Sequence, residues 1–196
     1  MDQKRRSADL SRFILYSDFN CPFCYALHER IHELKLFERV DWHGVQHAPY
    51  LPIPMSTWQG TMKAELQHEV AVVQQLAPEL PIALPAGKPN TRPAIDAAIH
   101  IFQQDHNRGL EFVREVYRAF WLEGRDISDA AVLAKLAGDV KAIGSVNTRI
   151  AEEWEVAWHE TGQAGVPLIV SPDGEFLVGC VLEDSLRQFF ALLGSG

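Results

Sequence analysis

The chain has 196 residues, of which 47% are hydrophobic and 22% are charged, a balance typical of a folded domain with a filled core. Its formal net charge of −8 argues against nucleic acid as a partner, because binding to phosphates requires a basic surface. No apolar run approaches the roughly 18 residues that a membrane-spanning helix needs, so a membrane partner is not expected either.

The N-terminus carries no recognisable secretory signal. No apolar stretch precedes Phe13-Ile14-Leu15 and no small-residue cleavage site follows it, so we expect a cytoplasmic protein. The basic run Lys4-Arg5-Arg6 lies in a polar segment and predicts a solvated tail.

The first third of the sequence has a β-α-β pattern. Residues 12–17 are apolar and aromatic, which predicts a buried strand. A helix is expected from Cys21, because Pro22 suits a first helical turn, where its missing N–H has no helical partner. Residues 40–46 are the candidate second strand. The buried face of the helix would carry residues at helical spacing, namely Leu27, Ile31 and Leu34.

The middle of the chain predicts a run of helices. Ser128 and Ser145 are candidate N-caps of the last two, and the proline-rich residues 78–93 predict a loop. Apolar residues recur at helical spacing over residues 62–77, 95–102, 113–121, 132–136 and 146–158.

The C-terminal segment returns to β-structure. Residues 166–170 and 175–178 are candidate strands joined by a turn, in which Pro172 fixes one φ and Gly174 supplies a positive φ. Apolar residues over 182–193 predict a closing helix. The order β-α-β, helices, β-β-α defines an α/β protein. We divide it into a discontinuous domain, residues 12–58 and 162–193, and an all-helical insertion, residues 59–161.

The motif Cys21-Pro22-Phe23-Cys24 carries the candidate chemistry. Three cysteines are too few for a disulfide framework, and a Cys-x-x-Cys pair in an unexported protein indicates redox or metal chemistry. Cys21 would lie at a helix N-terminus, where unpaired N–H groups and the helix dipole favour the reactive thiolate. Cys21 is therefore the expected attacking sulfur in disulfide exchange, and Cys24, one turn later, the resolving sulfur.

Gly165-Val166-Pro167 is the second element of interest. A proline that opens a strand after glycine is a candidate for a cis peptide bond, although such bonds are a minority of X–Pro bonds. Considered alone, Pro167 is a strand-starting proline.

Three segments together resemble the DsbA-like branch of the thioredoxin superfamily. They are Phe-Asn-Cys-Pro-Phe-Cys-Tyr at 19–25, Glu-Gly-Arg-Asp-Ile-Ser-Asp at 123–129 and Gly-Val-Pro at 165–167. The resemblance spans residues 12–193, and the polyketide-associated and 2-hydroxychromene-2-carboxylate isomerase-like members are the most similar.

This resemblance implies a thioredoxin fold with a helical insertion. It also implies that Pro167 is cis and lies against the redox cysteines, and that the backbone of Val166 binds an extended substrate. We place Pro22 and Phe23 among the substrate-binding residues as well. The expected partners are protein or small-molecule thiols and disulfides, and the redox-active disulfide replaces any cofactor, with glutathione as a possible co-substrate.

One departure from the family concerns charge inside the motif. Exported DsbA proteins carry a histidine there, whereas Phe23 supplies no charge. We therefore expect a potential between the thioredoxin and DsbA extremes of about −270 and −120 mV. Because cytosolic thiols are kept reduced, the direction of electron flow stays open, as does the choice between monomer and homodimer.

Two alternatives remain. Kappa-class glutathione transferases and 2-hydroxychromene-2-carboxylate isomerases share the fold and use a serine near the Cys21 position to activate glutathione; two cysteines here favour redox exchange. A non-catalytic metal-binding module would use Cys21, Cys24, His28 and His32, but along one helix these span about 16 Å, too far for one tetrahedral ion. We expect no metal, and a partly solvated histidine stripe.

Four further features have less specific expectations. Cys180 is expected to be a buried, inert thiol. Asp18 either caps a loop or influences the pKa values of the cysteines. His43 and His47 are expected to be surface or packing residues. Residues 49–55 either line a groove or form a buried crossover, and the sequence has no glycine loop for a nucleotide cofactor.

Overall fold

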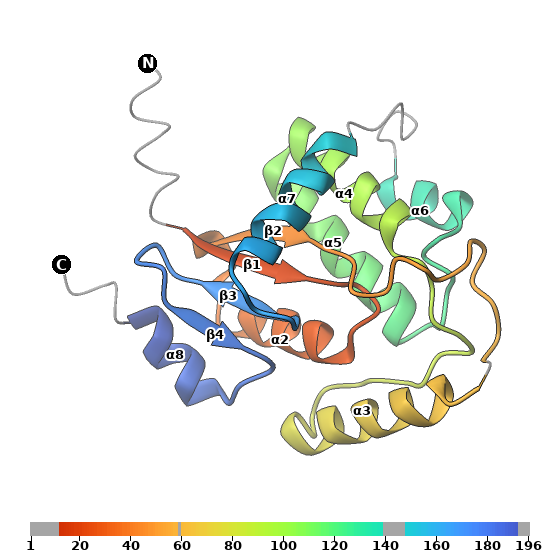
Figure 1. Cartoon of the computed structure of the whole chain (residues 1–196), viewed down its shortest axis with the longest axis horizontal. Coiled ribbons are helices and arrows are strands. Elements are labelled where there is room, and N and C mark those ends of the chain that lie inside the picture. The colour runs from red at the N-terminus through yellow and green to blue at the C-terminus, as the bar shows by residue number, and fades with distance from the viewer. Residues whose placement is uncertain (1–11, 59, 139–147, 192–196) are drawn as a thin grey trace.

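A mixed four-stranded sheet forms the centre of the fold in the computed structural model, which describes residues 12–58, 60–138 and 148–191 (Figure 1). The strand order is β2-β1-β3-β4, with β1 parallel to β2 and antiparallel to β3, and β3 antiparallel to β4. The strands are β1 (Phe13–Ser17), β2 (Val40–Gly44), β3 (Leu168–Val170) and β4 (Phe176–Val178).

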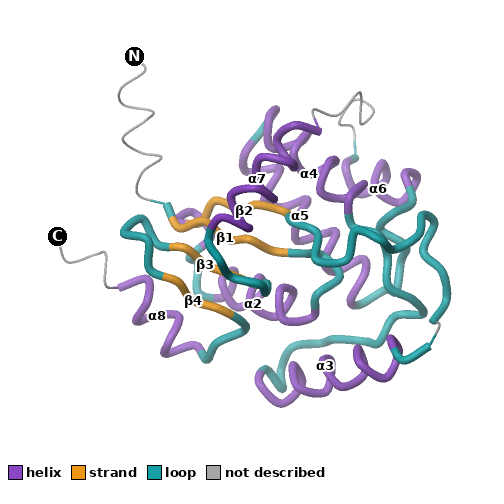
Figure 2. The backbone as a smooth tube through the Cα atoms, viewed as in Figure 1, coloured by secondary structure: helices purple, strands orange, loops and turns teal. Residues whose placement is uncertain are grey.

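Alternate residues of β1 face opposite layers, as the pleat of a strand requires. Phe13 and Leu15 are buried in a core that also holds Leu27 of α2 (Pro22–Glu33) and Phe190 of α8 (Glu183–Ala191). Tyr16 belongs to a second cluster with Trp158 of α7 (Thr148–Glu160). The sheet is therefore covered on both faces, as Figure 2 shows.

The chain segment between β2 and β3 is helical, and this confirms the predicted α/β order with an all-helical insertion. The division into residues 12–58 and 162–193 against 59–161 stays a prediction. No helix in the described part of the chain is long and apolar enough to cross a membrane. Besides α7, this segment holds α3 (Met62–Leu76), α4 (Arg92–Gln104), α5 (His106–Trp121) and α6 (Ala130–Ala137), and a short 3-10 helix, η1 (Phe37–Arg39), precedes β2.

The expected N-cap of α6 is wrong. Asp129, not Ser128, caps the helix, since its side chain accepts a hydrogen bond of 2.7 Å from the N–H of Ala131. The hydroxyl of Ser128 instead donates to Asp126 Oδ1 at 2.6 Å. The candidate cap Ser145 and the basic run Lys4-Arg5-Arg6 lie outside the described residues.

Helix α2 carries one buried carboxylate that joins it to α5. Arg114 and Arg118 each bond both oxygens of Glu29, at 2.8–3.2 Å. Burial alone would raise the pKa of Glu29, but the two arginines outweigh it and lower the pKa to about 2. These two ion pairs therefore fix α2 against the helical insertion.

We predict that Glu29→Gln lowers the free energy of unfolding by about 2 kcal/mol, because a neutral amide loses charge-assisted bonds that bury two arginine stems. Denaturant unfolding at neutral pH measures this. The difference from wild type should shrink as the pH falls from 4.5 towards 2, where wild-type Glu29 becomes protonated. Glu33→Gln, at an exposed position of the same helix, is the control, and equal stability of the two variants would contradict the prediction.

Candidate active site

The two cysteines of the motif lie at the start of α2, as predicted. Cys21 is the N-cap residue in an extended conformation, and Pro22 is in the first turn without disturbing it. Both cysteines are buried and neither is in a disulfide, with side chains only 7% (Cys21) and 1% (Cys24) exposed. Both sulfurs are therefore shielded from solvent, that of Cys24 more completely than that of Cys21.

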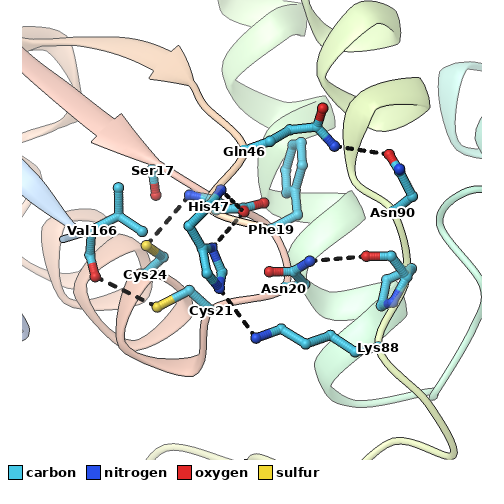
Figure 3. Close-up of polar contacts among 12 residues, drawn as sticks. Ser17, Phe19, Asn20, Cys21, Cys24, Gln46, His47, Lys88, Asn90 and Val166 are labelled. Atoms are coloured by element: carbon cyan, nitrogen blue, oxygen red, sulfur yellow. Dashed lines mark hydrogen bonds and ion pairs between the residues drawn. The ribbon is translucent and has the colours of Figure 1, made fainter. Parts of the chain in front are cut away.

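Val166 and Pro167 come from the opposite end of the chain to meet Cys21. The thiol of Cys21 donates to the carbonyl oxygen of Val166 at 3.6 Å (Figure 3). Pro167 is buried, and the Val166–Pro167 peptide bond is cis. The predicted neighbours of the sulfurs are thus brought together across 145 positions of sequence.

The surroundings of the two sulfurs shift their pKa values in opposite directions. A hydrogen bond from the thiol of Cys24 lowers the pKa of Cys21 against the effect of burial, and the nearby charge of His47 lowers it further. Burial raises the pKa of Cys24 well above its usual value, although the N–H of Asp18 donates to its sulfur at 3.4 Å. Cys21 is consequently the sulfur that forms a thiolate first.

Helix α5 of the insertion supplies the wall behind the motif. The hydroxyls of Tyr117 and Ser17 are 2.6 Å apart and both residues are fully buried, and Ser17 also bonds the side chain of Cys24. The indole of Trp121 donates to the carbonyl of Phe19 at 2.9 Å. These contacts hold the loop before Cys21, and they leave no signal in the sequence, because α5 is about 100 residues away from this loop.

A histidine that was expected to be a surface or packing residue lies beside Cys21. The imidazole Nδ1 of His47 is 2.6 Å from Oδ2 of Asp18, and the N–H of His47 donates to the same oxygen at 3.0 Å. Lys88 Nζ is 3.1 Å from the other ring nitrogen (Figure 3). Burial would lower the pKa of His47, but Asp18 outweighs it and raises the pKa. His47 is a surface residue, as expected, and its ion pair with Asp18 is the feature that the sequence did not reveal.

Amide side chains fix the loops that carry His47 and Lys88. Asn90 donates to the carbonyl oxygens of Leu51 at 2.8 Å and Pro49 at 3.2 Å, and it accepts from Gln46 at 2.8 Å. Asn20 donates to the carbonyl of Pro89 at 2.9 Å. This network joins the loop after β2, the segment before α4 and the residue preceding Cys21.

Segment 49–55 holds both buried and exposed residues, and its lining of a groove stays a prediction. Leu51 is buried, whereas Tyr50 and Ile53 are 77% and 57% exposed. Just after this segment, the chain approaches residues 85–90 so closely that a Cβ on Gly87 would lie 2.1 Å from the carbonyl oxygen of Ser56. Only glycine fits there, and the two segments pair as a bridge between Thr57 and Gly87.

The histidine stripe expected on α2 consists of His28 and His32, and of these His32 is partly exposed. His28 is fully buried, and neither of its ring nitrogens has a hydrogen-bond partner, so the expectation was wrong for this residue. It packs against Tyr117 and Phe37. Within the described residues, no group of three or more His, Cys, Asp or Glu side chains is placed to hold a metal ion, which gives the metal-binding alternative no support.

Cys180 is not the fully buried thiol that was expected. Its side chain is partly exposed, and its sulfur lies 3.7 Å from Nη1 of Arg30. Burial nevertheless raises the pKa of the Cys180 thiol. The thiol therefore remains protonated at neutral pH.

A thioredoxin-like sheet with a helical insertion and a Cys-x-x-Cys at the start of its first long helix defines a class of redox folds. Residues 13–191 match the DSBA-like thioredoxin domain family, and the chain belongs to this family. The resemblance inferred from the sequence is thereby confirmed.

Relatives and solved structures agree on the fold. YwbO, an uncharacterised protein of Bacillus subtilis (strain 168), is 28% identical over 136 residues, which are 67% of this chain and 66%, just under two thirds, of that protein. A protein of Streptomyces coelicolor described as a probable DsbA oxidoreductase has a TM-score of 0.74 at 16% identity, with 95% of this chain and 91% of that chain covered.

Two further structures have named activities. A 2-hydroxychromene-2-carboxylate isomerase has a TM-score of 0.69 at 22% identity, with 93% of this chain and 94% of that chain covered. The cytosolic disulfide reductase DsbM of Pseudomonas aeruginosa, in a structure with GSH, has a TM-score of 0.68 at 16% identity, with 94% and 98% covered. At these identities the structures establish a shared fold.

We predict that His28 makes the protein acid-sensitive. Burial, together with His32, lowers the pKa of His28 well below 6.5. Just below pH 6.5, His28 therefore binds a proton in the unfolded chain but not in the folded protein. Stability is then complete above pH 6.5 and falls as the pH drops below it. His28→Leu should flatten this loss in denaturant unfolding measured at successive pH values. His68→Leu, on the exposed face of α3, is the control, and an unchanged pH slope in His28→Leu would refute the prediction.

Proposed function

We propose that the protein is a thiol–disulfide oxidoreductase that reacts through Cys21 and Cys24. The proposal rests on the difference between the two sulfurs. Cys21 has a lowered pKa and lies next to the Val166 carbonyl, whereas Cys24 is more deeply buried and has a raised pKa. A reactive attacking thiolate and a protected resolving thiol are what disulfide exchange requires.

The reaction proceeds in two exchanges. The Cys21 thiolate attacks one sulfur of a substrate disulfide, the substrate S–S bond breaks, and the departing thiolate takes a proton from solvent. Cys24 then loses its proton and attacks the sulfur of Cys21, which releases the second substrate thiol. Two electrons pass to the substrate, and the protein holds a Cys21–Cys24 disulfide. The reverse sequence oxidises a substrate dithiol.

Substrate contacts are assigned to residues around the exposed side of Cys21. The backbone of Val166 offers hydrogen bonds to an extended substrate, with Pro167 behind it, and Pro22 and the half-buried Phe23 form the other side. The proposed partners are protein or small-molecule thiols and disulfides in the cytoplasm. Glutathione is the candidate co-substrate, and no further cofactor is required.

A glutathione-dependent transferase or isomerase is the second candidate. The fold likeness to a 2-hydroxychromene-2-carboxylate isomerase supports it. The presence of cysteine at both positions 21 and 24 favours the redox function, because activation of glutathione does not require a second, resolving thiol.

We predict a single two-electron transition when the purified protein is equilibrated with glutathione buffers, at a potential between about −270 and −120 mV. Cys21→Ser and Cys24→Ser should each abolish the transition, whereas Cys180→Ser should leave it in place. Thiol labelling followed by mass spectrometry measures the oxidised fraction. If no intramolecular disulfide forms at any poise, the redox function is excluded and glutathione-dependent isomerisation is tested next.

We also predict that iodoacetamide labels Cys21 well before Cys24 in the reduced wild-type protein at neutral pH. The lowered pKa of Cys21 supplies thiolate, whereas Cys24 is buried and stays protonated. Peptide mapping over a time course gives both rates, and denatured protein, in which the two rates should converge, is the control. Faster labelling of Cys24 in the folded protein would reverse the assignment of roles.

A further inference from the structure

The ion pair of Asp18 and His47 lies next to the motif but outside it. We propose that this pair is the charge partner of Cys21: Asp18 holds His47 as an imidazolium, and the imidazolium stabilises the Cys21 thiolate in the reduced protein. His47 is thus a positioning residue that makes the reduced form more stable and the protein more oxidising. The inference rests on the proposed redox function and specifies how that site is regulated.

The geometry fixes the ring of His47. Asp18 is fully buried, and its loop is closed by the N–H of Cys21, which donates to the Asp18 carbonyl at 3.2 Å. One oxygen of its carboxylate accepts from both the backbone and Nδ1 of His47. Two bonds from one residue to one buried oxygen determine the orientation of the imidazole, and Nδ1 must carry a proton, since the carboxylate accepts only.

Three charged or titratable groups face His47, each from a different element. Asp18 comes from the loop between β1 and α2, Cys21 from the start of α2, and Lys88 from the segment before α4. Asp18 and a Cys21 thiolate favour the imidazolium, whereas Lys88 opposes it. Because Lys88 is partly exposed, its ammonium can move into water when the second ring nitrogen takes a proton.

Electron transfer changes what His47 faces. In the reduced protein the imidazolium is opposite a thiolate; in the disulfide form that negative charge is gone, because its electrons are in the S–S bond. The second proton on His47 then loses one of its two stabilising partners, so oxidation lowers the pKa of His47 while Cys24 gives up its own proton. Stabilisation of the reduced form in this way raises the reduction potential. His47 thereby supplies, from a different segment, the charge that Phe23 does not supply within the motif.

Removal of His47 has two effects in the same direction. The thiolate loses a nearby positive charge, and the buried Asp18 carboxylate loses its cationic partner and keeps only the backbone N–H of residue 47. Both effects raise the pKa of Cys21, since Asp18 itself opposes the thiolate. Asp18→Asn in the His47→Gln background removes the bare carboxylate and should restore part of the thiolate.

The test compares wild type, His47→Gln and Asp18→Asn/His47→Gln. The ultraviolet absorbance of the thiolate and the alkylation rate of Cys21 are followed against pH, and the redox equilibrium with glutathione is measured. At a pH below the pKa of Cys21, a rise of one unit in that pKa corresponds to about a tenfold lower alkylation rate. We expect a loss of about that size in His47→Gln, a tenfold shift of the glutathione equilibrium towards the disulfide, and partial recovery of both in the double variant.

Wild type should titrate in two steps, which belong to the coupled pair of His47 and Cys21, and His47→Gln in one. His43→Gln, on β2 and stacked on Trp154, is the control and should match wild type. If the cysteines titrate as a redox couple but His47→Gln keeps the wild-type pH profile and equilibrium, the inference is overturned and the redox function stands. If wild type forms no disulfide, the function fails, while the thiolate titration still decides the role of His47.

Lys88→Gln covers the case in which His47→Gln does not fold. Removal of the opposing ammonium should stabilise the imidazolium, so the upper titration step moves to higher pH. A Lys88→Gln profile that coincides with wild type would overturn the inference on its own.

Discussion

Enclosure of helix α2 on nearly every side is the constraint on which the rest of the structure depends. The sheet covers one side and the insertion another, so a buried polar group on the helix is stabilised by a partner within the protein, which His28 lacks. Glu29 takes two arginines from α5, and the hydroxyl of Tyr25 donates to the carbonyl of Pro81. Arg30 donates to the carbonyls of Val181 and Leu76. The helix that carries the sulfurs is thereby joined to segments from every part of the fold.

Much of this arrangement was predictable from local pattern. The strands and helices follow from apolar periodicity, because burial on one face leaves a period of two or 3.6 in the sequence. Placement of Cys21 at the N-terminus of α2 follows from Pro22, which is compatible with a first turn and little else in a helix. The Gly-Val-Pro segment indicated a cis proline only in combination with the Cys-x-x-Cys motif. Its position next to Cys21 depends on the antiparallel pairing of β1 and β3.

The remaining features come from contacts between distant segments, which leave no periodic signal. His47 lies in a loop and is placed by Asp18, 29 positions earlier, so nothing near His47 in the sequence indicates its role. His28 was expected to be solvated because it lies beside the apolar stripe, but the insertion covers that side of the helix as well. Asp129 rather than Ser128 caps α6, because the hydroxyl of Ser128 donates to the Asp126 carboxylate instead.

The hydrogen bond between the Cys21 thiol and the Val166 carbonyl has a consequence for the synthesis of the chain. The ribosome delivers the N-terminus first, so both thiols leave the exit tunnel long before residues 166–170 exist. Until then β1 lacks its antiparallel neighbour β3, and the sulfurs lack the backbone that shields them. The nascent chain therefore exposes two thiols to oxidants and electrophiles, and the synthesis of residues 166–170 is the step that makes their shielding possible.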